Sequence, residues 1–91
     1  MGMNAPGVFA LSGNCSASIV PKVGYTVGQG SCKTLGSDTK ARVTLDVSVG
    51  VDRHSSWFTR TGVTYTTGAW IYDPNAPSGW PRSARVDLGT R

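Results

Sequence analysis

The sequence predicts an all-β domain, a small antiparallel β-sandwich or barrel of about six to eight strands. Its 91 residues suit one small domain. Thr, Ser and Val occur ten times each and Gly twelve times, whereas Glu is absent, a composition that argues against helical bundles and coiled coils. Apolar residues alternate with polar ones along several segments, and Gly, Pro and Asp interrupt these segments at short intervals.

The most regular segment covers residues 40–52. Every second residue in it is apolar, and the apolar set is Ala41, Val43, Leu45, Val47, Val49 and Val51. The intervening residues are polar or charged, apart from one glycine. A strict period of two over this length predicts one long, half-buried strand, and its β-branched content agrees.

The other expected strands are shorter and lie between turn signals. They cover residues 7–12, 16–20, 22–27, 31–35, 57–67, 69–72 and 82–88, with turns at 28–30, 36–38 and 52–56. Residues 73–81 contain three prolines and one glycine and are predicted to form an irregular loop. We expect residues 1–6 to be a flexible arm or a vector-derived remnant, and residues 7–91 to be a single β domain.

Aromatic residues are expected to fill part of the core of so small a domain. We predict that Tyr25 is buried, that one of Trp57 and Phe58 faces inward, and that one of Trp70 and Ile71 does so.

Two cysteines, Cys15 and Cys32, are the only ones in the chain. An even count in a short chain predicts one disulfide bond, which would stabilise the fold by about 3 kcal/mol. The bond implies a secreted, extracellular protein whose signal peptide has been removed. Two free thiols in a cytosolic protein are the alternative. The longest apolar run has four residues, so no membrane insertion is expected.

Catalytic and metal-binding patterns are weak. His54 is the only histidine, and its neighbours Asp52, Ser55 and Ser56 do not form a triad merely by being close in sequence. One His and two separated Cys do not provide the four ligands of a structural zinc site. The sequence therefore predicts no enzyme, no metal and no cofactor.

Loop aromatics are the strongest indication of binding. Trp80 lies between Gly79 and Pro81 in the expected loop, either folded back over the sheet edge or exposed as an anchor, and Arg82 follows it. Trp and Arg are frequent anchors in protein interfaces, and loops on a rigid scaffold often carry binding residues. Tyr72 and a second patch at Trp57 and Arg60 complete the candidate site. We expect a binding protein (an inhibitor, an antimicrobial effector or an adaptor) that contacts a protein or a cell-surface polymer.

Two further functions stay open. An assembly subunit could pair an edge strand with a partner sheet. A single-stranded nucleic-acid-binding domain would fit the net charge of +4 and the aromatic and basic residues at 57–60 and 80–82, although the basic residues are spread along the whole chain. The composition, which is free of Glu and richer in Arg than in Lys, resembles that of small exported β domains of bacteria.

Overall fold

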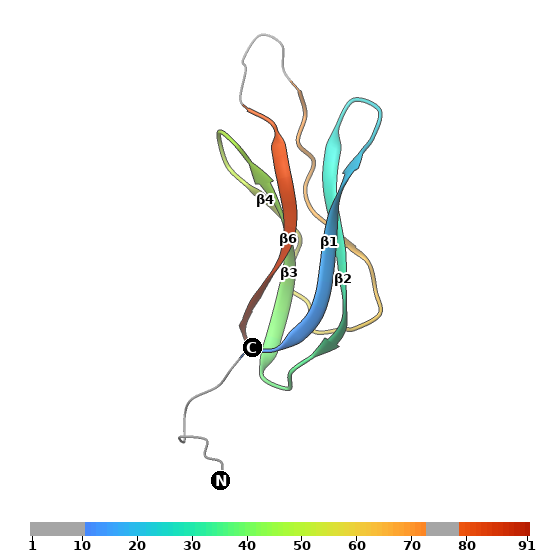
Figure 1. Ribbon diagram of the computed structural model, residues 1–91, viewed down its shortest axis with the longest axis vertical. Helices are drawn as coiled ribbons and strands as arrows, with labels where there is room; N and C mark the ends of the chain where they lie inside the picture. Colours follow the sequence, from blue (N-terminus) through green and yellow to red (C-terminus); the bar gives the residue numbers. More distant parts are fainter. Residues whose placement is uncertain (1–10, 73–78) are drawn as a thin grey trace.

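A computed structural model describes residues 11–72 and 79–91, which form two antiparallel three-stranded sheets (Figure 1). The first sheet has the order β1-β2-β5, with β1 at Gly13–Pro21, β2 at Thr26–Leu35 and β5 at Tyr65–Thr66. The second sheet has the order β4-β3-β6, with β4 at Arg53–His54, β3 at Thr39–Val47 and β6 at Pro81–Thr90. The all-β prediction is confirmed in its sandwich form. The arm at 1–6, most of the strand at 7–12 and most of the loop at 73–81 lie outside the described residues.

Strand β3 is the centre of the second sheet. It pairs with β6 along its whole length, and its inward side chains Ala41, Val43 and Leu45 are fully buried. The prediction that this strand continues to residue 52 is wrong. β3 ends at Val47, and the chain then turns at Gly50, which has a φ of 98°. The turn leaves Val49 and Val51 exposed.

Strands β1 and β2 form a hairpin in the first sheet. The predicted strand at 22–27 is wrong in its first half, because residues 22–25 are the hairpin turn. The Lys22 N–H donates to the Tyr25 carbonyl at 2.7 Å, and Gly24 has a φ of 85°. Val23 at the tip is 99% exposed, and Tyr25 is exposed rather than buried as predicted.

Gly28 and Gly30 lie inside β2, so the turn predicted at residues 28–30 is also wrong. A Cβ on Gly30 would be 2.7 Å from the Ser16 carbonyl oxygen and 3.1 Å from Val43 Cγ2. A Cβ on Gly28 would be 3.4 Å from Leu45 Cβ. Here glycine is favoured by the close approach of the neighbouring strand β1 and of the facing sheet, not by a turn.

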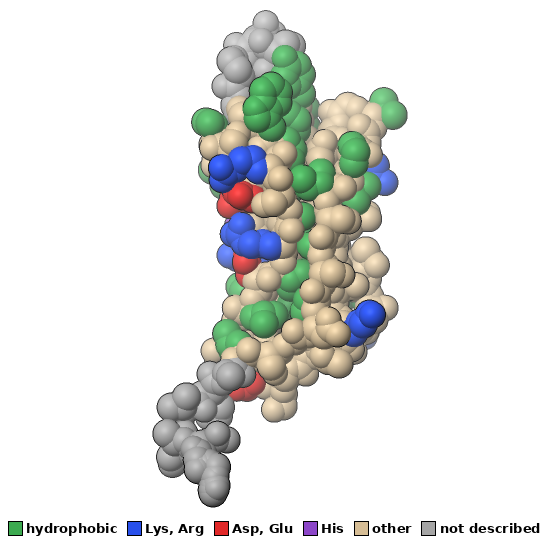
Figure 2. All heavy atoms as spheres, in the orientation of Figure 1, with side chains coloured by type: hydrophobic (Ala, Val, Ile, Leu, Met, Phe, Trp, Pro, Cys, Tyr) green, Lys and Arg blue, Asp and Glu red, His purple; other side chains and the backbone are tan. Residues whose placement is uncertain are grey.

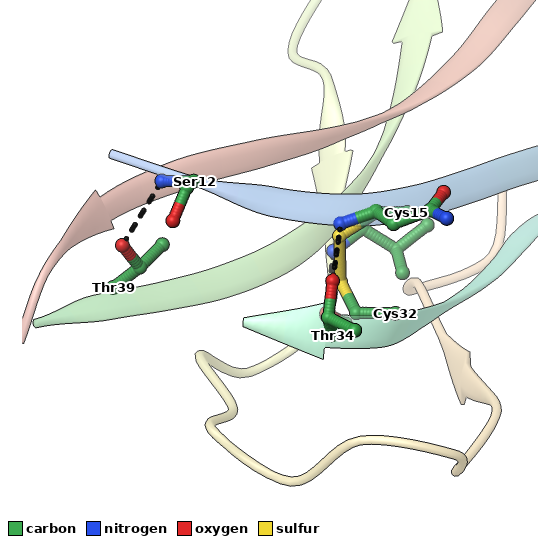
Figure 3. The surroundings of a disulfide bond; sticks show 8 residues. Ser12, Cys15, Cys32, Thr34 and Thr39 are labelled. Carbon is green, nitrogen blue, oxygen red and sulfur yellow. Dashed lines mark hydrogen bonds between the residues drawn. A yellow bond between two sulfur atoms is a disulfide. The ribbon is translucent and has the colours of Figure 1, made fainter. Parts of the chain in front are cut away.

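The predicted disulfide between Cys15 and Cys32 is confirmed (Figure 3). It joins β1 and β2 within the first sheet, and Cys32 is fully buried against Ala41, Val43 and other core residues. The Asn14 N–H donates to Thr34 Oγ1 at 3.2 Å beside it. A disulfide suggests a non-cytoplasmic location.

Residues 57–67 are not the continuous strand that was predicted. Phe58 forms an isolated bridge with Ala41 in the second sheet, whereas Tyr65 belongs to the first. The segment therefore crosses from one sheet to the other, and it turns at Gly62, where φ is 74°. The burial of Phe58 with Trp57 exposed matches the prediction.

The last core aromatic lies at the other end of this crossing segment. Trp70 is buried and its neighbour Ile71 is exposed, as predicted. The predicted strand at 69–72 is reduced to an isolated bridge between Trp70 and Thr26. Among the described residues there is no helix with the length and hydropathy that crossing a membrane requires.

Candidate functional site

Exposed hydrophobic side chains gather at one end of the sandwich. The two sheets are aligned along the strand direction, because Gly30 of β2 faces Val43 of β3 and Gly28 faces Leu45. The β1–β2 turn, the end of β3 and the start of β6 therefore meet at the same end. Seven of the nine large hydrophobic side chains that are exposed in the described residues lie here: Val23, Tyr25, Val49, Val51, Ile71, Tyr72 and Trp80. We call this set the apolar end.

Hydrophobic side chains are visible at the upper end of the molecule in Figure 2. A gathering of large exposed hydrophobic side chains at one end of a small domain often marks a contact site.

The backbone of Trp80 is held in place by hydrogen bonds. Its carbonyl accepts the Ser48 N–H at 2.9 Å, and its own N–H donates to Ser48 Oγ at 2.9 Å. The preceding Gly79 has a φ of 77°, and a Cβ there would be 2.6 Å from the Val49 nitrogen. The backbone is thus fixed, while the residue as a whole is 62% exposed. Such an anchor loses little conformational entropy on binding.

Tyr72 belongs to a second part of the same end. Trp70 and Thr26 exchange two backbone hydrogen bonds, at 2.8 and 2.9 Å, which places Tyr72 beside the β1–β2 turn. The Tyr72 and Trp70 rings are tilted by 50° with centroids 6.2 Å apart. A shallow cleft of about 330 Å³ is lined by Lys22, Gly24, Tyr25, Thr26, Trp70 and Tyr72.

Polar contacts hold the segments of the apolar end together. Arg53 Nε donates to the Ala69 carbonyl at 3.1 Å, and the same guanidinium donates to the Val51 carbonyl. Asp52 Oδ1 accepts the Val47 N–H at 3.0 Å. That hydrogen bond is the main reason why the pKa of Asp52 lies below its usual value.

The five predicted binding residues fall into two groups. Trp80 and Tyr72 are part of the apolar end, and Arg82 lies next to them with its guanidinium 3.2 Å from Asp46. Trp57 lies elsewhere, over the outer face of the second sheet, with Lys40 Nζ 4.6 Å and Arg42 Cζ 4.7 Å from its ring centroid.

Arg60 is exposed in the crossing segment, two residues after Phe58. The Gly62 N–H just beyond it donates to the Cys32 carbonyl. Trp57 and Arg60 are therefore in the half of the sandwich opposite the apolar end.

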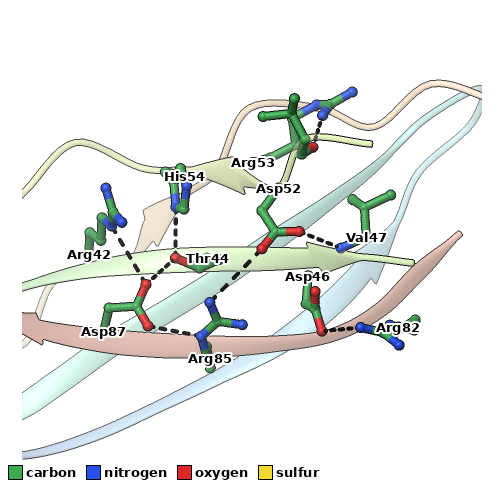
Figure 4. A network of polar contacts seen from close by, with 11 residues as sticks. Arg42, Thr44, Asp46, Val47, Asp52, Arg53, His54, Arg82, Arg85 and Asp87 are labelled. Carbon is green, nitrogen blue, oxygen red and sulfur yellow. Dashed lines mark hydrogen bonds and ion pairs between the residues drawn. The ribbon is translucent and has the colours of Figure 1, made fainter. Parts of the chain in front are cut away.

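His54 belongs to a polar network on the outer face of the second sheet (Figure 4). Thr44 Oγ1 donates to Asp87 Oδ2 at 2.6 Å and lies 2.8 Å from His54 Nδ1, so the histidine donates to the hydroxyl. The Thr44 side chain is fully buried, which closes its hydroxyl to a substrate. Ser55 Oγ accepts the Val43 N–H and donates to the Ser56 carbonyl. These contacts hold the sheet together and do not form a nucleophile–base pair.

Asp87 is the most connected carboxylate of this network. Burial alone would raise its pKa, but hydrogen bonds from Thr44 and Arg85 and the charge of Arg42 outweigh burial and keep the pKa below its usual value. The hydrogen bond between Arg85 and Asp87 also raises the pKa of Arg85 above its usual value. Among residues 11–72 and 79–91, no group of three His, Cys, Asp or Glu side chains is placed to hold a metal ion.

Several members of the apolar end were not predicted from the sequence. Val49 and Val51 continue the alternation of β3, and Val23 fits the alternation expected for residues 22–27. The glycine beside each of them, Gly24 or Gly50, is the local signal for the turns that expose them. Comparisons with family models, with curated proteins and with solved structures found no match to this chain.

Proposed function

We propose that this chain is a secreted binding protein that contacts a partner protein through its apolar end. The observation that carries the proposal is the gathering of seven exposed hydrophobic side chains at one end of the sandwich, on backbone held by hydrogen bonds. An inhibitor, an effector or an adaptor would each use such a surface.

The composition of the apolar end favours a protein partner. Trp and Tyr are enriched in the cores of protein interfaces, and Trp80, Tyr72 and Tyr25 supply three such rings next to aliphatic side chains. Docking would remove these side chains from water, and the hydrophobic effect would drive association. A cell-surface polymer is the alternative, because sugar rings also stack on exposed aromatic side chains.

Basic side chains border the apolar end and point to an acidic rim on the partner. Lys22 lines the cleft beside Tyr25, and Arg82 lies at the start of β6 with a side chain that is 60% exposed. Charge complementarity at a rim raises the association rate more than the affinity, so high salt should slow association. The disulfide supports an extracellular setting for this contact.

The proposal is tested by binding the chain to an array of extracellular proteins, with a glycan array in parallel. For a protein hit we expect Trp80→Ala to weaken binding about tenfold or more. Trp57→Ala serves as the control for loss of a tryptophan, and Arg60→Ala serves as the control for Arg82→Ala. Both controls lie in the other half of the sandwich and should change affinity by less than about twofold.

Three results would contradict the proposal. Binding that depends on Trp57 and Arg60 but not on Trp80 would move the contact surface to the opposite half. Saturable binding to glycans alone, lost in Trp80→Ala, would replace the partner protein by a cell-surface polymer. Binding to single-stranded nucleic acid with no protein or glycan hit would replace the function altogether.

A further inference from the structure

Both sheets expose an unpaired edge on the same flank of the sandwich. β1 is the edge of the first sheet and β6 is the edge of the second, and in the described residues neither pairs on its outer side. Figure 1 shows the two strands next to each other. An unpaired edge offers a row of N–H and C=O groups that can pair with another strand.

Strand β1 lacks the usual obstacles to such pairing. Gly13–Pro21 contains no charged residue, and its single proline is the last residue of the strand. Charged side chains and internal prolines are the features with which proteins commonly block an edge. Ser16 and Ser18 are exposed on the outer face of this edge.

The middle of the β1 edge and the middle of the β6 edge lie at the same position along the strand direction. In the first sheet Ala17 pairs with Gly30, and in the second Val43 pairs with Val86. Gly30 faces Val43 directly, because a Cβ on Gly30 would be 3.1 Å from Val43 Cγ2. Ala17 and Val86 therefore lie opposite each other at the same height of the flank.

A twofold axis at this position would relate two copies of the chain, so that each edge pairs with the same edge of the copy. If β1 pairs antiparallel with a second β1 about Ala17, Ser16 lies opposite Ser18 of the copy. The same axis sets the two β6 strands antiparallel about Val86, which places Arg85 opposite Asp87 of the copy, and the reverse. With the pair that Arg85 and Asp87 already form at 2.9 Å, four charges of alternating sign meet.

Neighbouring registers lack this complementarity. Moving the axis to Leu88 sets Arg85 opposite Arg91 of the copy, which is a pair of like charges. Moving it to Ala84 sets Arg85 opposite Ser83 and leaves Asp87 without an opposite charge. Of the three axes through Ala84, Val86 and Leu88, only the axis through Val86 sets opposite charges across from each other, and Val86 is the residue that is level with Ala17.

We propose that this flank binds a second copy of the chain through antiparallel β1–β1 pairing centred on Ala17. The β6 edges contribute through the long side chain of Arg85, which reaches Asp87 of the copy. This interface is separate from the apolar end, so the proposal does not depend on the proposed function.

Sedimentation equilibrium of the intact, oxidised chain from about 10 μM to about 1 mM tests the proposal. We expect a reversible dimer at the upper concentrations. Ser16→Lys together with Ser18→Lys would place like charges opposite each other and weaken dimerisation about tenfold or more. Ser16→Lys with Ser18→Glu would place opposite charges across the axis and restore it. Both positions are exposed, and unchanged thermal midpoints would show that the fold is kept.

A matched control separates edge pairing from a general effect of net charge. Thr59→Lys with Thr61→Lys adds the same charge at two exposed positions of the crossing segment, and it should leave most of the dimerisation in place. A wild-type chain that is monomeric at every concentration overturns the proposal. It is also overturned if both Ser16 and Ser18 double variants weaken the dimer equally, or if neither does. Trp80→Ala should leave the dimer unchanged.

Discussion

Substitution of Gly30 by alanine measures how tightly the neighbouring strand β1 and Val43 of the facing sheet pack around the β2 backbone. The new Cβ would lie 2.7 Å from the Ser16 carbonyl oxygen, 3.0 Å from Ala17 Cβ and 3.1 Å from Val43 Cγ2. The first two are a backbone atom and the root of a side chain, and neither can rotate away. Overpacking of this kind costs about 1–3 kcal/mol, and the distance to the backbone atom places Gly30→Ala at about 2–3 kcal/mol.

The assay is guanidinium or thermal unfolding followed by tryptophan fluorescence. For a domain of this size a loss of 2–3 kcal/mol lowers the thermal midpoint by roughly 10–20 °C. The slope of the unfolding free energy against denaturant should stay constant, because the substitution acts on packing and not on the extent of unfolding.

Two other glycines provide graded controls. A Cβ on Gly28 would have its nearest contacts at 3.3, 3.4 and 3.5 Å, so Gly28→Ala should lose about 1 kcal/mol. A Cβ on Gly68 would meet only Arg53 Cδ, at 4.0 Å. Gly68→Ala should be neutral or stabilising by up to about 1 kcal/mol through the unfolded state. If Gly30→Ala lost no more stability than Gly68→Ala, the close packing of β1 and Val43 around Gly30 would be refuted.

Three further predictions concern the polar network, the disulfide and the tryptophans. Because the pKa of Asp87 is lower in the folded than in the unfolded state, its stabilisation is present above about pH 4 and disappears as the pH falls further. The thermal midpoint should drop between about pH 5 and pH 2, and Asp87→Asn should reduce that drop; an equal drop in both proteins would contradict the linkage. Reduction of the Cys15–Cys32 bond should lower the unfolding free energy by about 3 kcal/mol, and alkylation of two thiols should require reduction. Trp70→Ala should cost about 3–5 kcal/mol in denaturant unfolding, whereas Trp80→Ala should stay within about 0.5 kcal/mol; equal losses would mean that Trp80 is packed as Trp70 is.

The parts of the fold that could be predicted are those in which one face of a strand is buried along its length. Residues 41–47 alternate because one side of β3 faces the core, and the pattern alone predicts both the strand and its buried side. The end of the strand could not be predicted in this way, because Val49 and Val51 keep the same parity after the chain has turned. β-branched residues favour strands, so Val49 and Val51 give no sign in the sequence that the strand has already ended.

Glycine has two structural roles that a single sequence does not separate. Gly24 and Gly50 are turn residues with positive φ, whereas Gly28 and Gly30 are strand residues beneath a second sheet. The difference depends on which residues pack against them, and this is a tertiary property.

The candidate site shows the same limit. Trp80 could be singled out as a loop residue because it lies between glycine and proline, but the sequence left open whether its ring is exposed or folded over the sheet edge. The aliphatic members of the apolar end could not, since their exposure depends on where three separate turns meet in space. Trp57 and Arg60 were predicted as a second binding patch because aromatic and basic residues lie close together in that part of the sequence. The fold places both residues in the half of the sandwich opposite the apolar end.

The two glycines of β2 also control how this strand can be aligned during folding. A slip of one residue would turn every side chain of β2 to the wrong face. A slip of two residues would preserve the faces, but in one direction it moves Cys32 into the position of Gly30. In the other direction it moves Thr26 into the position of Gly28. The first slip brings a Cβ to 2.7 Å from the Ser16 carbonyl oxygen, and the second places a whole threonine side chain where a Cβ alone would be 3.3 Å from Thr67 Cγ2. Both slips therefore crowd the space between the sheets, and only the native alignment brings Cys32 opposite Cys15.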